Sequence, residues 1–310
     1  MDIEKSKSVV EVKTNGQRNG QHGKQDRLNV LKTYKIYIDG KFPRTESGRY
    51  YGLEDKSGKT IANICRCSRK DFREAAVAAR KAQPAWASRS AYNKGQILYR
   101  IAEILEGRRS QFIEELILQG SQAVAAEKEV DNSIDLLVYY AGWCDKYQQV
   151  FSSVNPVESS HFNFSVPEAM GIVTILSPEG FGLAGLIASI APAIAGGNTV
   201  IVLASQSKPL AAVTFGEVLN SSDVPAGVVN LLTGFRSELV SNFATHMDVN
   251  ALVYYGNSSA ELKLIKESAS LNVKRVAVYE EDSILKASSR NPYRIMDLQE
   301  IKTTWHPIGQ

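Results

Sequence analysis

Short apolar runs that alternate with helical patterns constrain the fold of this 310-residue chain more than any other feature. Five runs rich in Val, Ile, Leu and Tyr are too short for helices and are bounded by turn residues, which is typical of buried strands. The predicted strands are Gly171–Leu176, Thr199–Leu203, Val228–Leu232, Asn250–Tyr255 and Val273–Tyr279. The predicted helices between them are Leu183–Ile194, Pro209–Leu219, Ser237–Ala244 and Ser258–Ser268. One helix between successive strands predicts an α/β fold with a doubly wound parallel sheet and right-handed crossovers.

The loops after these strands are the expected place for a ligand. Ligands of doubly wound sheets bind beyond the carboxyl ends of the strands. The loops that begin at Ser177, Leu203, Gly234, Gly256 and Tyr279 are therefore expected to face any cofactor.

Three helical patterns precede the predicted sheet. Ser68 and Asp71 have the spacing of a capping box, which predicts a helix through Ala82. The segment Gln96–Leu118 has one apolar face and is predicted as a second helix. An apolar stripe along Val130–Cys144 predicts a third helix.

Charge and cysteine content exclude several classes of protein. With 36 Lys and Arg against 33 Asp and Glu, the net charge of +3 is too small to indicate a nucleic-acid or membrane partner. Three cysteines without framework spacing fit a reducing compartment, and no cluster of Cys and His predicts a metal site. Residues 1–30 are polar and glycine-rich, which predicts a disordered tail. Because that tail lacks an apolar run, we expect a cytoplasmic location.

Several segments resemble the aldehyde dehydrogenase family. Ala195–Val202 (AGGNTVIV) and Val224–Gly234 (VPAGVVNLLTG) are similar to the cofactor-domain signature of that family. Tyr34–Phe42 resembles its opening hairpin, Tyr139–Trp143 its long helix, and Lys274–Val276 the start of its catalytic-glutamate strand. The resemblance covers roughly residues 33–279 and implies a Rossmann-like cofactor domain with a small antiparallel oligomerisation sheet.

The resemblance also implies which residues would contact NAD(P). By position, the cofactor-binding residues are Pro178, Gly180, Phe181, Ser205, Gln206, Gly234, Gly256 and Asn257. Because neighbouring positions depart from the family pattern, no cofactor is assigned with certainty, and NAD(P) binding is expected to be weak or lost.

The departures fall at the family's chemistry. The family loop Pro-Trp-Asn-Phe reads Pro178-Glu179-Gly180-Phe181 here, and losing the Asn donor costs about 2.7–4 kcal/mol of transition-state stabilisation. Leu203 replaces the lysine that grips the adenosine ribose, and Glu261 replaces a glycine of a cofactor-contacting turn, where a carboxylate repels a pyrophosphate. Tyr279 replaces the general-base glutamate, and a phenol with an ordinary pKa of about 10 is a poor base near neutrality.

The nucleophile is the largest predicted loss. In the family, a reactive cysteine lies on a separate domain, a few dozen residues after the catalytic glutamate. Cys65, Cys67 and Cys144 all precede Tyr279. A thiohemiacetal mechanism needs a thiolate near the nicotinamide. No catalytic residue is therefore assigned, the catalytic domain is expected to be missing, and the chain is expected to be a pseudoenzyme.

Two segments resemble strands of the family's oligomerisation sheet. His161–Val166 alternates with period two, and Ile295–Ile308 resembles the terminal strand. Unpaired edge strands are an aggregation hazard, so the presence of both favours a role in assembly. The pattern is most similar to the short second unit of tandem, family 16-type aldehyde dehydrogenases. We expect a cofactor-binding domain at residues 31–285, with a hairpin near 150–168, and an oligomerisation arm at residues 286–310.

Three charged segments have alternative interpretations. Glu179 could either seal the site or bind another ligand. The run Glu280-Glu281-Asp282 favours a solvated turn over a displaced general base. Lys208 is a candidate replacement for the missing cation, but it lies five positions after Leu203, at a predicted helix start.

Three functions remain open from the sequence. The first is a non-catalytic subunit that assembles with, or regulates, copies of itself or a full-length aldehyde dehydrogenase. The second is an NAD(P)-dependent aldehyde oxidoreductase that is active only in a complex. The third is a dinucleotide-binding sensor.

Overall fold

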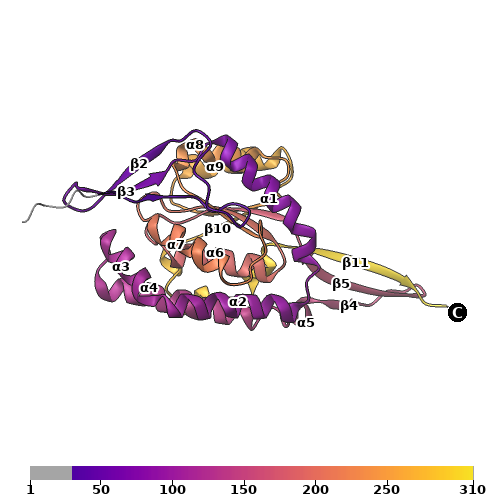
Figure 1. Cartoon of the computed structure of the whole chain (residues 1–310). Helices are drawn as coiled ribbons and strands as arrows, with labels where there is room; N and C mark the ends of the chain where they lie inside the picture. The colour runs from indigo at the N-terminus through magenta and orange to yellow at the C-terminus, as the bar shows by residue number, and fades with distance from the viewer. Residues whose placement is uncertain (1–29, 310) are drawn as a thin grey trace, which may run out of the picture. The chain divides into compact units, whose positions relative to one another are not determined.

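The computed structural model describes residues 30–309, and their centre is a five-stranded parallel sheet (Figure 1). Its strands are β6 (Ile172–Leu176), β7 (Thr199–Leu203), β8 (Val229–Leu232), β9 (Ala251–Tyr255) and β10 (Arg275–Tyr279). They lie in the order β10-β9-β6-β7-β8, and every neighbouring pair is parallel. The prediction of a doubly wound α/β fold is confirmed. The predicted tail at residues 1–30 lies outside the described residues, apart from Val30.

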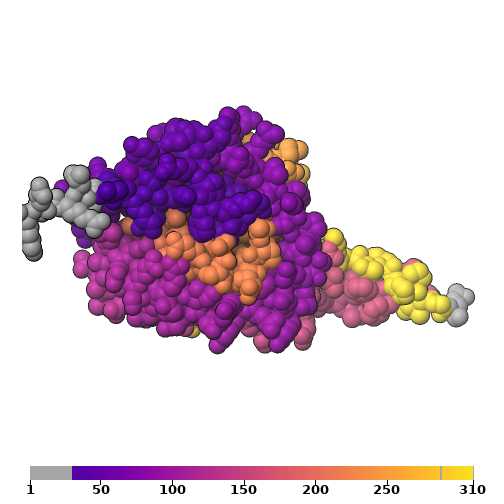
Figure 2. Space-filling view, viewed as in Figure 1, coloured from indigo at the N-terminus to yellow at the C-terminus, as the bar shows by residue number. Residues whose placement is uncertain are grey.

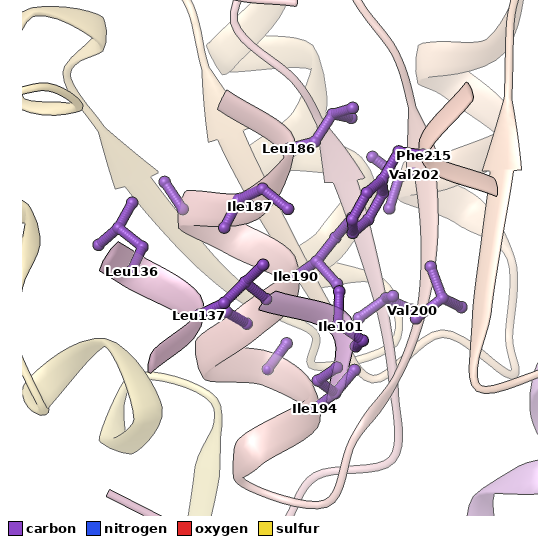
Figure 3. Packing of buried hydrophobic residues seen from close by; sticks show 14 of the residues in the cluster. Ile101, Leu136, Leu137, Leu186, Ile187, Ile190, Ile194, Val200, Val202 and Phe215 are labelled. Carbon is purple, nitrogen blue, oxygen red and sulfur yellow. The ribbon is translucent and has the colours of Figure 1, made fainter. Parts of the chain in front are cut away.

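Helices cover both faces of this sheet. The helices between the strands are α6 (Ala184–Ala195), α7 (Leu210–Asn220), α8 (Arg236–Thr245) and α9 (Ser259–Ser270). In Figure 1, α6 and α7 lie on one face, and α8 and α9 lie on the other. Because strand side chains alternate between faces, each face has its own core. On the α6 face, Ile187, Ile190 and Ile194 pack with Val200 and Val202 (Figure 3).

The segment before the central sheet adds a small sheet and further helices. The strands are β1 (Thr33–Tyr34), β2 (Tyr50–Glu54) and β3 (Thr60–Cys65). The helices are α1 (Arg69–Ala87), α2 (Ala91–Gly107), α3 (Arg109–Leu118), α4 (Ala123–Ala141) and α5 (Tyr147–Phe151). Helix α1 packs on the α8 face, whereas α2 and α4 pack on the α6 face (Figure 1). None of the helices within residues 30–309 is long and apolar enough to cross a bilayer.

Three details of this helical segment differ from the sequence prediction. Ser68 forms the predicted capping box, but α1 continues past Ala82 to Ala87. The single helix predicted at residues 96–118 is wrong, because α2 and α3 meet at Arg108, whose φ of −109° and ψ of 12° leave the helical region. Gly107, a poor helix former, directly precedes this break. Cys144 is buried, but it lies in the turn after α4 and not on the helix.

A third sheet, which is antiparallel, extends away from the central sheet (Figures 1 and 2). Its strands are β4 (Ser153–Asn155), β5 (His161–Ala169) and β11 (Gln299–Pro307), in the order β11-β5-β4. We call these three strands the arm. Residues 280–298, which include α10 (Tyr293–Met296), join β10 directly to β11. The predicted small antiparallel sheet is confirmed.

Asn198 ties the arm to the central sheet. Its side chain is fully buried, and its oxygen accepts a hydrogen bond from the Gly171 amide at 2.9 Å, just before β6. Its amide donates to the carbonyl of Leu298 at 3.0 Å, just before β11, and to that of Ala193 in α6 at 3.3 Å. One side chain therefore satisfies buried backbone groups from three elements, which water does not reach.

We predict that Asn198→Ala lowers the free energy of unfolding by roughly 2–5 kcal/mol, because it leaves the buried Gly171 amide without its acceptor and removes the side-chain donor from the carbonyls of Leu298 and Ala193. Urea denaturation followed by circular dichroism measures this loss. The control is Asn220→Ala at an exposed position on α7, which should change stability by less than about 0.5 kcal/mol. A loss below about 1 kcal/mol for Asn198→Ala would contradict the role of this amide.

Candidate functional site

The candidate site is the carboxyl edge of the central sheet, where the strands end in loops. Strand β6 leads through α6 to β7 on one side, whereas β9 lies on the other side of β6. The loops after β6 and β9 therefore flank the point where the strand order reverses. Ligands of doubly wound sheets bind at this point.

The carboxylate of Glu179, in the loop after β6, contacts the loop after β7. Its Oε2 accepts hydrogen bonds from the amides of Gln206 and Ser207 at 2.9 and 3.3 Å, and from the Ser205 hydroxyl at 3.0 Å. Its backbone carbonyl accepts from the hydroxyls of Ser205 and Ser207 at 3.1 and 3.0 Å. Converging amides of this kind also suit phosphate oxygens. Of the two interpretations of Glu179, the geometry favours a sealed loop.

Glu281 covers the loop after β6 in a similar way. Its carboxylate accepts hydrogen bonds from the amides of Glu179 and Gly180 at 3.1 and 3.4 Å. The solvated turn predicted at residues 280–282 is therefore wrong for Glu281. Lys208 donates to the Gly180 carbonyl at 2.8 Å and to the Ser121 hydroxyl at 3.2 Å. Its ammonium group thus links the loop after β6 to the residues between α3 and α4.

A third carboxylate, that of Glu129 on α4, lies at the N-terminus of α6. The residue is 3% exposed, and Oε1 accepts hydrogen bonds from the amides of Leu183 and Ala184 at 2.8 and 3.1 Å. Burial raises the pKa of this carboxyl group, and the two backbone hydrogen bonds oppose the rise. A helix N-terminus attracts anions. At α6, the chain supplies that anion itself.

Arg236, the first residue of α8, contacts both the loop after β6 and the residues that follow β9. Its guanidinium donates to the Ser177 carbonyl at 2.6 Å and pairs with the Glu261 carboxylate at 3.5 Å. A Cβ atom on Gly256 would lie 3.1 Å from Nη1 of Arg236, so the guanidinium packs closely against this glycine. The carboxylate of Glu261 is therefore neutralised by the chain itself.

The two other departures from the family pattern are both integrated into the fold. Leu203 is 2% exposed and packs in the core on the α8 face. The Tyr279 hydroxyl donates to Oδ2 of Asp297 at 2.6 Å, and the Arg294 guanidinium lies 4.4 Å from the centre of its ring. Burial, and then the Asp297 carboxylate, raise the pKa of Tyr279 far above its ordinary value. This phenol cannot act as a general base near neutrality.

None of the three cysteines offers a reactive thiol. Cys65, Cys67 and Cys144 are unpaired and buried. Burial raises the pKa of each thiol, that of Cys144 to about 12. Cys67 lies against the loop after β8, where its amide donates to the Thr233 carbonyl at 2.9 Å. A buried thiol with a raised pKa is a poor nucleophile.

The residues predicted to bind a cofactor all lie in loops at the carboxyl edge. Pro178, Gly180 and Phe181 follow β6, Ser205 and Gln206 follow β7, Gly234 follows β8, and Gly256 and Asn257 follow β9. Glu179 brings the first two loops together. The loop after β8 packs instead beside the end of β3. The close approach is measured at Gly234, where a Cβ atom would lie 3.1 Å from the amide nitrogen of Cys67. A role of these residues in cofactor binding stays a prediction.

Sequence reasoning missed three residues that fill this edge: Glu129, Arg236 and Glu281. Glu129 does fall on the buried face of α4, beside Val130, so an acidic residue within an apolar stripe was the available signal. Arg236 lies two residues after Gly234, which ends a predicted strand, and this position does not by itself indicate a role. Within residues 30–309, no group of three or more His, Cys, Asp or Glu could hold a metal ion.

Comparisons with known proteins point to one family. The model described as "Aldehyde dehydrogenase family" matches residues 44–280. Cytosolic 10-formyltetrahydrofolate dehydrogenase of Mus musculus is 29% identical over 81% of this chain and 29% of its own length. Retinal dehydrogenase 2 of Gallus gallus is 31% identical over 81% of this chain and 49% of its own length.

Solved structures agree with this match. PnpE from Pseudomonas sp. WBC-3 is 27% identical with a TM-score of 0.76, over 79% of this chain and 50% of that chain. The NAD+ complex of aldehyde dehydrogenase from Bacillus cereus has the same TM-score of 0.76 at 23% identity, over 80% of this chain and 51% of that chain. The chain thus spans about half, or less, of the length of these relatives.

We predict that Glu179→Ala lowers the free energy of unfolding by about 1–3 kcal/mol, because it removes the acceptor of several amide and hydroxyl groups. Chemical denaturation measures the change. Glu280→Ala is the matched control, since it removes an exposed carboxylate from the neighbouring loop and should change stability by less than about 0.5 kcal/mol. Equal effects of the two variants would contradict a sealing role for Glu179.

Proposed function

Since the chain belongs to the aldehyde dehydrogenase family, we propose that it is a non-catalytic subunit that assembles through its arm with copies of itself or with a full-length catalytic member. The observation that carries this proposal is the occupation of the carboxyl edge by the chain's own carboxylates. In this role the protein regulates or scaffolds a complex in the cytoplasm, and its own residues perform no hydride transfer.

The backbone amides at the carboxyl edge already donate hydrogen bonds to carboxylates of the chain, which argues against tight cofactor binding. Glu129, Glu179 and Glu281 together accept hydrogen bonds from six backbone amides in and beside the loops after β6 and β7. A dinucleotide pyrophosphate at this edge would meet carboxylate charge in place of free amides. Hydrogen bonds to charged groups are worth about 1.5–3 kcal/mol each, so displacing even one carboxylate offsets a large part of the binding energy. We therefore propose that NAD(P) binding is weak or lost.

The internal connection between two strands argues against catalysis by this chain. Residues 280–298 join β10 to β11 and contain no cysteine. The hydroxyl of Tyr279, at the position of the family's general base, is bound to Asp297. A thiolate and a base are both needed for the family's chemistry. A catalytic partner would have to supply them, which is the alternative function of an oxidoreductase active only in a complex.

The arm offers the surface for assembly. Strand β11 is an edge strand of nine residues, and its outer side faces no further strand within residues 30–309. Ile301 and Trp305 on this strand are 54% and 56% exposed, and Phe162 on β5 is 44% exposed. A long edge strand with exposed apolar side chains is a template for pairing with another chain. This surface supports pairing with a second copy or with the corresponding strand of a relative.

We predict that the purified protein forms an oligomer in size-exclusion chromatography with light scattering, with a mass above the 34.1 kDa of one chain. Ile301→Asp combined with Trp305→Asp should weaken association at least about tenfold, or about 1.4 kcal/mol, because two charges would be buried on the arm. The dissociation constant is read from dilution series.

The matched control for the arm is Val77→Asp, which adds a charge at an exposed apolar position of α1. It should leave association unchanged. A wild-type protein that is strictly monomeric, both alone and mixed with a full-length aldehyde dehydrogenase from the same source, would refute the assembly proposal.

Isothermal titration calorimetry tests the closed cofactor edge. We predict that NAD+ and NADP+ bind the wild-type protein with Kd values above about 1 mM, because carboxylates of the chain already accept hydrogen bonds from the amides that would bind an anion. A full-length aldehyde dehydrogenase titrated under the same conditions is the positive control. Saturable micromolar binding without turnover would instead favour a dinucleotide sensor. Steady NADH production from an aldehyde by the purified protein would establish an oxidoreductase.

A further inference from the structure

A charged cavity lies at the opposite edge of the central sheet, where the arm begins. It has a volume of about 540 Å³ and lies between the end of α1, the start of α2, the turn after α4 and the starts of β6 and β7. The cavity and the carboxyl edge lie at opposite ends of the strands, because the parallel strands all begin at one edge of the sheet and end at the other. None of the residues predicted to bind a cofactor lines it.

Positive charge exceeds negative charge in this cavity. Arg80, Arg89, Lys94 and Lys302 line it, together with a single carboxylate, that of Glu168. Lys302 pairs with Glu168, and Arg80 pairs with Asp248 at 3.4 Å. Arg89 and Lys94 have no carboxylate within 4.0 Å among the described residues. Two positive charges are therefore left without a counter-ion in this part of the structure.

Lys94 is the less expected of these two cations. The residue is only 6% exposed. Within residues 30–309, its ammonium group donates to an uncharged acceptor, the carbonyl of Ala87, at 2.9 Å. An ammonium group has three donors, and burying it without an opposite charge is costly. Burial accordingly lowers the pKa of Lys94. An anion in the cavity would remove this cost.

The backbone beside Lys94 leaves room for its ammonium group. Gly197 has a φ of +87°, and a Cβ atom at this position would lie 3.2 Å from Nζ of Lys94. A larger residue would be strained by the backbone conformation and would crowd the ammonium group. Arg89, in the turn between α1 and α2, also lines the cavity, and its guanidinium donates to the Asn93 side chain at 2.7 Å.

We propose that this cavity binds a small phosphate monoester, with Lys94 at its base and Arg89 at its rim as the counter-charges. A phosphate monoester carries about two negative charges near neutral pH, which matches the two uncompensated cations. A guanidinium fits phosphate oxygens with two parallel hydrogen bonds, and an ammonium adds a point charge. The volume is within the range of about 300–1,000 Å³ that is typical of small-molecule sites.

Calorimetric titration of the full 310-residue protein with glycerol 3-phosphate, at constant ionic strength, tests the proposal. We expect saturable one-site binding. Lys94→Met, which keeps the length of the side chain and removes its charge, should weaken binding at least about tenfold, and Arg89→Gln should weaken it about five- to tenfold. Lys266→Met, at an exposed position on α9, is the matched control and should bind like the wild type.

Two further measurements keep the test decisive. Thermal melts show whether Lys94→Met is folded, and Arg89→Gln, at an exposed position, tests the site even where Lys94→Met is not. Succinate at the same concentration should bind at least about tenfold more weakly than glycerol 3-phosphate, because its two charges lie on two separate carboxylates, whereas a phosphate monoester has about two charges and three acceptor oxygens on one group. Absence of saturable heat, equal binding of succinate, or unchanged binding by Arg89→Gln would overturn the proposal.

The test is independent of the proposed assembly. The variant that combines Ile301→Asp with Trp305→Asp, on the arm, serves as a weakly associating background for the same titration. Binding of similar strength by the wild type and this variant supports a site within one chain. Binding by the variant alone would show that a neighbouring chain fills the cavity in the assembled protein, and would overturn a small-molecule site there.

Discussion

The buried amide of Asn198 holds together the elements on which both proposed surfaces depend. It joins the start of β6, the end of α6 and the residue before β11, so the arm and the central sheet share one fixed junction. The amide is fully buried, and its partners are backbone groups that no solvent molecule reaches. An amide can do this because it both donates and accepts, whereas an apolar residue of similar size would leave the buried Gly171 amide without an acceptor and would remove a donor from two buried carbonyls.

Beyond this junction, the two edges of the sheet have opposite electrostatic character. At the carboxyl edge, Glu129, Glu179 and Glu281 satisfy the amides that a bound anion would otherwise contact. At the other edge, Arg89 and Lys94 have no carboxylate partner within the described part of the chain. The Rossmann-like fold is thus preserved, while amides at its carboxyl edge are hydrogen-bonded to the chain's own carboxylates. The same scaffold leaves a basic cavity where the arm begins.

The strands and helices were largely predictable because their signals are local. Short β-branched runs and the capping box at Ser68 depend on neighbouring residues, and the structure confirms them. The break at Arg108 was missed because both halves share one apolar periodicity and the chain has no proline there. The role of Glu281 was missed because its partner, the Glu179 amide, lies 102 residues away in sequence. A charged run after a strand has the same sequence pattern whether it is solvated or bonded to a distant loop.

The sequence by itself determined the order of strands and helices, the family resemblance, the absence of a cysteine between β10 and β11 and the expectation that Tyr279 stands at the position of the family's base. Each of these is a matter of residue identity at a position along the chain. Only the tertiary structure decided that Glu179 and Glu281 turn onto backbone amides, that Asp297 holds Tyr279, and that Lys94 lies buried beside Gly197 without a counter-ion. Those outcomes depend on distances between segments far apart in sequence, which local propensity does not encode.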